Sequence, residues 1–130
     1  MTINDKNINY DKIRELGIKN SHAIDEMLKN DMTKLKENSI STELNSFWDK
    51  FETKINKMQK SREKNQILNL YVVLSENRAI VINEMDVLEP WFVKVTGVNT
   101  ATGKPDKEIL NSRKDDPEII VELVDIVDYE

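Results

Sequence analysis

The sequence predicts an α+β fold in which N-terminal helices pack on a small, mostly antiparallel sheet. In the first half of the 130-residue chain, apolar residues recur at the spacing of one helical face. From residue 67 onward they gather into short clusters rich in valine and isoleucine, which favours strands. Each half alone would leave an apolar face uncovered. We therefore expect residues 1–130 to form a single domain, with a sheet over residues about 67–128.

Two shorter helices are predicted ahead of the longest one. Residues 1–8 are polar and are expected to form a mobile leader. The next apolar residues, at positions 10, 13 and 16, predict a short helix that ends at Gly17. A second helix is predicted over residues 21–37, from apolar residues that share one helical face: Ala23, Ile24, Met27, Leu28, Met32 and Leu35.

The longest element is a helix predicted over residues about 42–64. Its apolar residues are spaced by 3, 1, 3, 4 and 3 positions, which is a helical and not a strand pattern: Leu44, Phe47, Trp48, Phe51, Ile55 and Met58. Ser41 or Thr42 is suited to cap its N-terminus. Because only a short link separates it from the preceding helix, the two are expected to pack as an antiparallel pair. The aromatic stripe is expected to lie in the core.

At residue 67 the pattern changes to that of strands. Ile67–Leu74 is apolar on both faces and predicts an inner strand. Residues 79–83 return from a turn as its hairpin partner. A third strand is predicted over residues 91–98, in which Gly97 indicates a bulge or a close approach of another backbone.

Two polar stretches are expected to be loops, and the tail is ambiguous. Residues 86–90 and 99–116 carry few apolar side chains, and the second stretch holds Gly103 and Pro105. Residues 117–130 are dense in β-branched residues, which favours a strand. The Asp-Pro-Glu sequence at their start would also suit the first turn of a helix. Between these alternatives we predict the strand.

Composition excludes several classes of site. The chain has no cysteine and one histidine, His22, so disulfides and thiolate metal sites are excluded, and no cofactor or metal is expected. No apolar segment approaches the ~20 residues of a membrane helix. The N-terminus lacks the apolar core of a signal peptide. We therefore expect a cytoplasmic protein that does not associate with membranes.

No pattern typical of an enzyme stands out in the sequence. The segment Gly97–Pro105 comes closest to a phosphate-binding loop, but five rather than four residues separate its glycines and a proline follows its lysine. His22 has Ser21 only as a chain neighbour, without a third group to orient the pair. The acidic clusters lack the spacing of a calcium-binding loop. We expect a protein without enzymatic activity.

Charge is distributed unevenly along the chain. Residues 1–66 carry 13 Lys and Arg against 11 Asp and Glu, a net of +2, whereas residues 67–130 carry 6 against 13, a net of −7. Acidic residues near the C-terminus are expected to form an exposed partner-binding surface: Glu118, Glu122, Asp125 and Asp128. Trp91, at the start of a strand, is the candidate for a partly exposed anchor.

The leading hypothesis is a small acidic interaction protein that binds a basic surface of a protein partner. The Asn- and Lys-rich composition is typical of AT-rich genomes, which favours a phage or mobile-element inhibitor of a host protein. One alternative is a nucleic-acid-binding accessory protein that uses the cations at the end of the long helix: Lys57, Lys60, Arg62 and Lys64. Another alternative is a structural component of a virion or other assembly.

Overall fold

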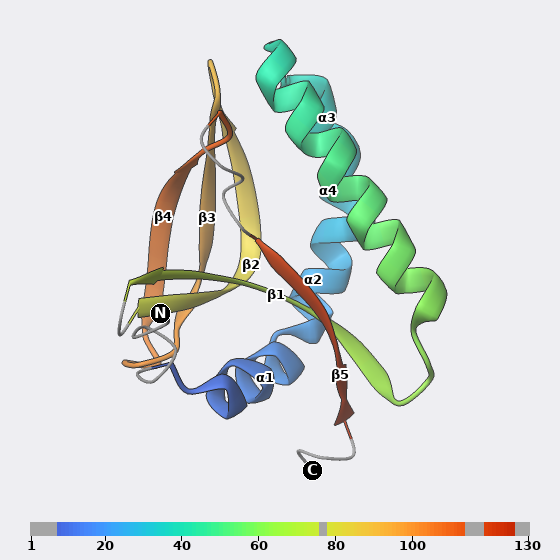
Figure 1. Cartoon of the computed structure of the whole chain (residues 1–130), viewed down its shortest axis with the longest axis vertical. Helices are drawn as coiled ribbons and strands as arrows, with labels where there is room; N and C mark the ends of the chain where they lie inside the picture. The colour runs from blue at the N-terminus through green and yellow to red at the C-terminus, as the bar shows by residue number, and fades with distance from the viewer. Residues whose placement is uncertain (1–7, 76–77, 114–118, 127–130) are drawn as a thin grey trace, which may run out of the picture.

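The computed structural model describes residues 8–75, 78–113 and 119–126. The helices are α1 (Tyr10–Lys19), α2 (Ser21–Glu26), η2 (Met27–Asp31), α3 (Met32–Asn38) and α4 (Thr42–Ser61). The strands are β1 (Gln66–Ser75), β2 (Arg78–Leu88), β3 (Phe92–Asn99), β4 (Pro105–Asn111) and β5 (Ile120–Asp125). Helices precede an antiparallel sheet along the chain, so the predicted α+β class is confirmed (Figure 1).

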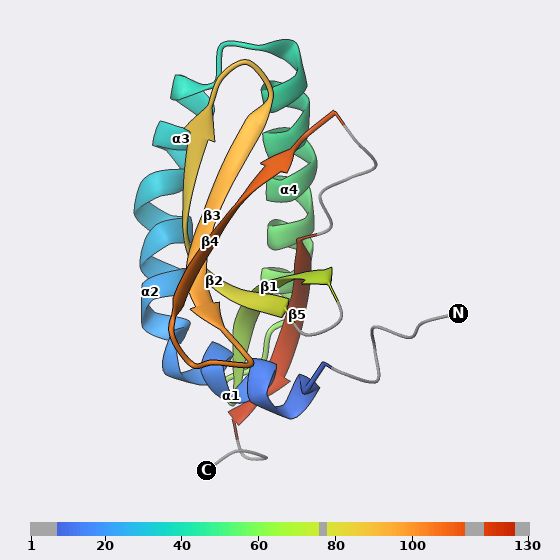
Figure 2. The same ribbon diagram turned by 90° about the vertical axis from the view of Figure 1, so that its left-hand side faces the viewer.

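The described strands form one sheet in the order β4-β3-β2-β1-β5, with every neighbouring pair antiparallel. Strand β1 therefore lies inside the sheet, and β4 and β5 form its two edges. Helices α2 to α4 lie over one face (Figure 1). Figure 2 shows the opposite face of β2, β3 and β4, where α1 crosses only the lower end.

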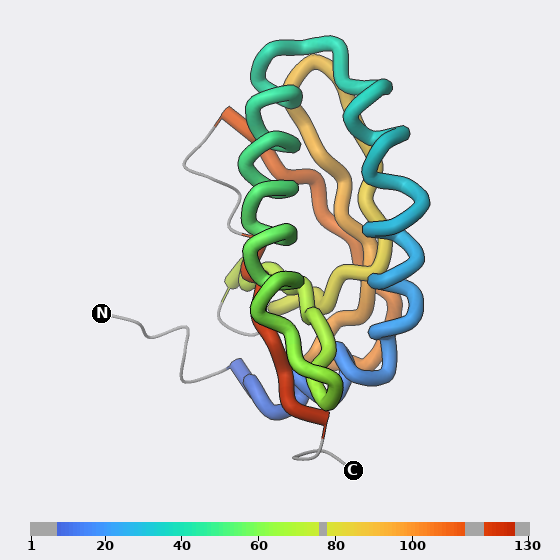
Figure 3. Tube along the Cα trace, turned by 90° about the vertical axis from the view of Figure 1, so that its right-hand side faces the viewer, coloured from blue at the N-terminus to red at the C-terminus, as the bar shows by residue number. Residues whose placement is uncertain are grey.

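Helix α4 confirms the longest predicted element. It begins at Thr42, where the Ser41 Oγ accepts a hydrogen bond from the Leu44 N–H at 3.2 Å, as expected of an N-cap. It ends at Ser61 because the backbone of Arg62 is extended, three residues before the predicted end. Helices α3 and α4 run antiparallel across a short link, also as predicted (Figure 3).

The aromatic stripe of α4 lies between the helices and the sheet. Trp48 is fully buried, Phe51 is 4% exposed and Phe47 is half-buried. They share a core cluster with the β1 residues Leu70 and Val72. The Trp48 Nε1 donates a hydrogen bond to the Ser39 Oγ, so the ring nitrogen is satisfied inside the core. The expected core position of the stripe is thus confirmed.

The predicted helix over residues 21–37 forms, but a π-helical turn interrupts it. Its buried residues Met27 and Met32 are five positions apart, about 1.4 turns of an α-helix, which would place them on different faces. The η2 segment between α2 and α3 adds the i→i+5 turn that brings both onto the sheet side. The sequence carried no clear signal for this turn, because Leu28 lies the usual four residues before Met32 and is only partly buried in the structure.

Strand β1 is buried on both faces. Leu68, Leu70 and Val72 pack under α2 to α4. Tyr71 belongs to a second cluster on the other face, where α1 contributes Ile13 and Leu16. The prediction of an inner strand from Ile67–Leu74 is confirmed, and α1 supplies the cover that its second face requires.

Two expectations about the N-terminal region differ from the structure. Gly17 does not end α1, which continues to Lys19, but lies buried against Asn69 of β1. A Cβ at position 17 would lie 2.3 Å from the Asn69 Oδ1, so glycine is required for close packing and not for a cap. The expected leader included Ile8, but this residue is buried under α1, and residues 1–7 lie outside the described part.

Both expected loops contain strand. Strand β2 continues to Leu88, because after a register shift at Ile82/Glu84 it pairs with β3 again. The polar stretch 99–116 contains β4, whose backbone pairs with β3 from Pro105 to Asn111. Pairing with a neighbouring strand overrides the weak strand propensity of this charged segment. The tail forms β5 over Ile120–Asp125, which confirms the choice of strand over helix.

Gly97 confirms the predicted close approach. A Cβ at this position would lie 1.8 Å from the Val81 carbonyl oxygen. The residue pairs with Ile82, directly beside the register shift in β2. Absence of a side chain therefore lets the backbone of β2 approach β3 at its irregularity.

Phe51→Ala is expected to destabilise the fold by about 3–5 kcal/mol, because it removes a buried aromatic ring from the main core. Asn45→Ala, at an exposed position of the same helix, should change stability by less than about 0.5 kcal/mol. Urea titrations of both variants measure the difference. A loss below about 1 kcal/mol for Phe51→Ala would contradict the core assignment.

Gly17→Ala is expected to destabilise the fold by about 1–3 kcal/mol through overpacking, although alanine normally stabilises a helix interior by about 1 kcal/mol relative to glycine. The Asn69 amide cannot swing away freely, because it is fully buried and its Nδ2 donates to the Ile13 carbonyl and the Glu122 carboxylate. In an Asn69→Ala background, Gly17→Ala should be neutral or stabilising. Equal effects in both backgrounds, measured by denaturant titration, would contradict the contact.

Candidate functional site

Of the four predicted acidic residues, the structure describes Glu122 and Asp125, and it does not bring these two together on one face. Glu122 is only 21% exposed at its side chain; its Oε1 accepts a hydrogen bond from the Asn69 Nδ2 and lies 3.8 Å from the Arg14 Nε. Asp125 is exposed and accepts a hydrogen bond from Gln66 of β1. Three positions apart on one strand, Glu122 and Asp125 point to opposite faces of the sheet. Glu118 and Asp128 lie outside the described residues.

Trp91 lies half-buried between β2 and β3, one residue after Pro90. The Arg113 guanidinium lies 4.3 Å from the centroid of its ring, a distance typical of a cation–π contact. The Trp91 carbonyl oxygen accepts hydrogen bonds from the Ser112 N–H and Oγ. These contacts fix the residue beside the end of β4. The role of Trp91 as a partner-binding anchor stays a prediction.

The motifs weighed as catalytic form ordinary local structure. The segment after Gly97 is the hairpin loop between β3 and β4, in which the Asn99 side chain accepts hydrogen bonds from the Ala101 and Thr102 N–H groups. The His22 side chain is 91% exposed, with the Glu26 carboxylate 3.9 Å away. Neither arrangement provides an oriented nucleophile or a general base held against a second group.

The basic end of α4 is partly engaged in the fold. The Arg62 guanidinium donates to the Gln66 carbonyl oxygen at 3.0 Å and lies 3.5 Å from the Asp25 carboxylate. It therefore joins α2, α4 and β1. Lys57, Lys60 and Lys64 are exposed. Nucleic-acid binding through these residues stays a prediction.

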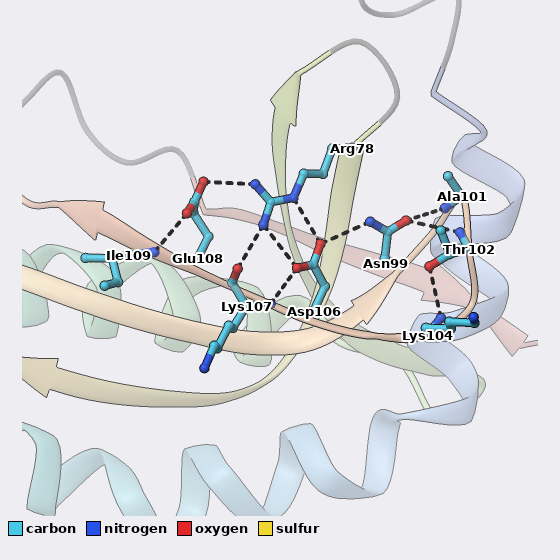
Figure 4. Close-up of polar contacts among 9 residues, drawn as sticks. All are labelled: Arg78, Asn99, Ala101, Thr102, Lys104, Asp106, Lys107, Glu108 and Ile109. Carbon is cyan, nitrogen blue, oxygen red and sulfur yellow. Dashed lines mark hydrogen bonds and ion pairs between the residues drawn. The ribbon is translucent and has the colours of Figure 1, made fainter.

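A network around Arg78 joins three strands (Figure 4). The Arg78 guanidinium, from the start of β2, makes two 3.0 Å hydrogen bonds to the Asp106 carboxylate of β4 and contacts Glu108 at 3.2 Å. Asn99, at the end of β3, also donates to Asp106. The hydrogen bonds from Arg78, then those from Asn99 and the Lys107 N–H, lower the pKa of Asp106 to about 2, against the opposing effect of partial burial. We assign this cluster a role in holding the edge strand β4.

A groove lies between α4 and β5. These two elements, far apart in sequence, lie side by side (Figure 3). The groove has a volume of about 650 Å³ and is open to solvent. We call it the α4–β5 groove and define it by its lining residues: Phe47, Lys50, Phe51, Lys54, Lys57, Met58, Ser61, Ile119, Ile120 and Val121.

Two kinds of side chain line the α4–β5 groove. Phe51, Ile119 and Val121 are buried core residues whose surfaces form its apolar floor, together with the half-buried Phe47 and Met58. Three exposed lysines of α4 follow the i, i+4, i+7 spacing of one helical face and form a basic rim: Lys50, Lys54 and Lys57. The described lining contains no carboxylate.

One lysine of the rim contacts the backbone just before β5. The Lys54 Nζ lies 3.5 Å from the Ile119 carbonyl oxygen, immediately before β5. Among the described residues, Lys50 and Lys57 have no ion-pair partner. The groove therefore presents positive charge beside an apolar surface, an arrangement suited to a ligand that is both apolar and anionic.

Sequence reasoning missed this groove. The pattern did contain a signal, because Lys50, Lys54 and Lys57 flank the apolar stripe along one side of the helix. Without the position of β5, however, the sequence predicts only that these lysines lie on the solvent-exposed face of an amphipathic helix. The groove exists only because the chain returns to the same helix much later, with Ile119 lying 65 positions after Lys54.

Comparison with known proteins gives no assignment: no family model, no curated protein and no solved structure matches the chain. Among the described helices, none is long and apolar enough to cross a membrane. The described residues contain no group of three or more His, Asp or Glu side chains that would hold a metal ion.

Asp106→Asn is expected to destabilise the fold on the order of 1 kcal/mol at neutral pH, since it weakens a two-pronged but partly exposed ion pair with Arg78. A lowered pKa means that the charged form contributes stability above the ordinary carboxyl pKa of about 3.9. That contribution is lost as pH falls from about 4 toward 2. Thermal melts of both proteins should therefore differ at pH 7 and converge below pH 4; a constant difference would contradict the assignment.

Proposed function

We propose that this chain is a small, non-enzymatic interaction protein that holds a protein partner in the α4–β5 groove. The observation that carries the proposal is the combination of an apolar floor with a rim of three exposed lysines. Apolar floors give a bound partner its affinity, and a charged rim selects the partner and speeds its approach.

The shape of the groove favours a macromolecule over a small substrate. Its volume of about 650 Å³ falls in the range of ligand pockets, but it is a partly open groove and not an enclosed cavity. Its charged groups are lysines of like sign, and the part of its lining that the structure describes holds no acid that could form a proton-transfer pair with them. These features support binding of a side chain or segment that remains attached to a larger surface.

The sequence predicts a partner with a basic surface, whereas the basic rim of this groove suits an acidic partner. A basic-surfaced partner requires an exposed acidic patch, and Glu122 is instead engaged by Asn69 and lies near Arg14. That expectation stays a prediction, as does a role as a phage or mobile-element inhibitor. The groove supports the broader class of interaction protein without depending on either.

A charge-reversal triple variant of the rim tests the proposal: Lys50→Glu, Lys54→Glu and Lys57→Glu. Its matched control reverses three exposed lysines outside the groove: Lys29→Glu, Lys34→Glu and Lys64→Glu. Affinity capture from a lysate of the source cells, quantified by mass spectrometry, should show proteins that wild type and control retain and that the rim variant loses. Circular dichroism checks that both variants are folded.

Two results would overturn the proposal. One is that no protein is enriched by the wild-type chain, and the other is that the rim variant and the control capture the same proteins to the same extent. Nucleic acid that is retained by wild type and lost by the rim variant would also contradict it, and would favour the predicted nucleic-acid-binding alternative.

A further inference from the structure

We infer that the occupant of the α4–β5 groove is an extended protein segment, both apolar and acidic, that adds as a further strand to the edge of β5 where no other described strand pairs. This inference rests on the proposed function, because it names the chemistry of the partner in that same groove. Three features of the molecule support an added strand: the direction of the peptide groups of β5, the contrast between the two sheet edges, and the spacing of the lysines.

The peptide groups of β5 alternate between β1 and the groove. The Ile126 N–H donates to the Asn65 carbonyl at 2.7 Å, so the groups of even-numbered residues point toward β1. Those of odd-numbered residues then point away from the sheet, as the contact between the Lys54 Nζ and the Ile119 oxygen shows. The Val121 peptide group therefore points to the edge on which a partner strand would pair.

The two edges of the sheet are built differently. Strand β4 begins with proline and three charged residues, Pro105 to Glu108, and the Arg78 network holds it; such features discourage pairing with another strand. Strand β5 has the sequence Ile-Val-Glu-Leu-Val-Asp, with no proline, and its edge opens into an apolar groove. Of the two edges, as the described residues show them, β5 is the one that combines an unpaired edge with a surface for the side chains of an added strand.

The lysine rim selects the charge of that strand. Along α4, Lys50 and Lys54 are separated by roughly 6 Å and Lys50 and Lys57 by roughly 10 Å, at 1.5 Å per residue. Carboxylates on alternate residues of an extended chain are about 6.8 Å apart, which matches the first of these separations. A ligand with a single carboxylate, such as a fatty acid, would meet one lysine and leave the others without a counter-charge. A segment with several acidic residues can place a carboxylate beside more than one lysine of the rim.

The test uses a fluorescently labelled peptide of alternating glutamate and valine, titrated with the full chain and followed by fluorescence anisotropy at physiological salt. Binding is expected for this peptide and not for one of alternating lysine and valine. The Lys50→Glu/Lys54→Glu variant should bind about tenfold more weakly, whereas Lys34→Glu/Lys64→Glu should bind as wild type does.

Backbone pairing is tested by two N-methylated versions of the same peptide, one methylated at every valine and the other at every glutamate. In a paired strand, alternate N–H groups point to the same side, so one version should lose binding and the other should keep it. Equal behaviour of the two versions would overturn strand addition.

Absence of binding by the alternating glutamate–valine peptide would overturn the inference. If cellular proteins are still captured through the groove lysines in that case, the proposed function stands and only its partner chemistry is wrong. If instead the rim variant captures as well as wild type while the peptide binds normally, the proposed function fails although the groove accepts an acidic strand. The peptide titration and the lysate capture can therefore contradict the inference and the proposed function independently.

Discussion

The fold depends on covering both faces of β1. Its residues from Ile67 to Val72 are all buried, so one layer of helices cannot satisfy it. Helices α2 to α4 supply the larger core, and α1 must cross to the opposite face and pack on Tyr71. That crossing brings α1 so close to the sheet that Gly17 lies directly on Asn69. The chemistry of one inner strand thus sets the positions of the first helix and of the residues that contact it.

Asn69 shows how a polar residue is accommodated in this strand. It is fully buried, and its Nδ2 donates to the Ile13 carbonyl and to the Glu122 carboxylate. Burial of a carboxylate beside it would be costly if Glu122 had no cation nearby, and the Arg14 guanidinium of α1 lies 3.8 Å away. The second face of the sheet is therefore closed by a polar link between α1, β1 and β5, and this link occupies a residue that the sequence had suggested for a partner.

Local sequence patterns predicted the helices and strands whose conformation is determined by the residues within the segment itself. The stripe of α4 and the doubly apolar run of β1 were both predicted correctly, because each carries its periodicity in one continuous segment. Strand β4 was missed because its Pro-Asp-Lys-Glu sequence has little strand propensity and is held by pairing with β3 and by Arg78, which lies 28 residues earlier. Gly17 was misassigned because the usual rule treats glycine near a helix end as a cap, whereas here packing against a distant strand decides.

The net charge of the chain can be counted from the sequence, whereas the charge at one surface depends on how distant segments come together. The chain carries a net −5, yet two carboxylates of α4 lie on the side of the helix that faces α3: Lys36 of α3 lies 2.8 Å from Glu52 and 3.8 Å from Asp49. The lysines of the groove occupy the other side of the apolar stripe. At physiological salt, charges more than about 8 Å apart are largely screened, so distant carboxylates have little effect on a segment already at the groove. The acidic total therefore governs long-range encounter, whereas the sorting of charges across α4 governs which segment the groove retains.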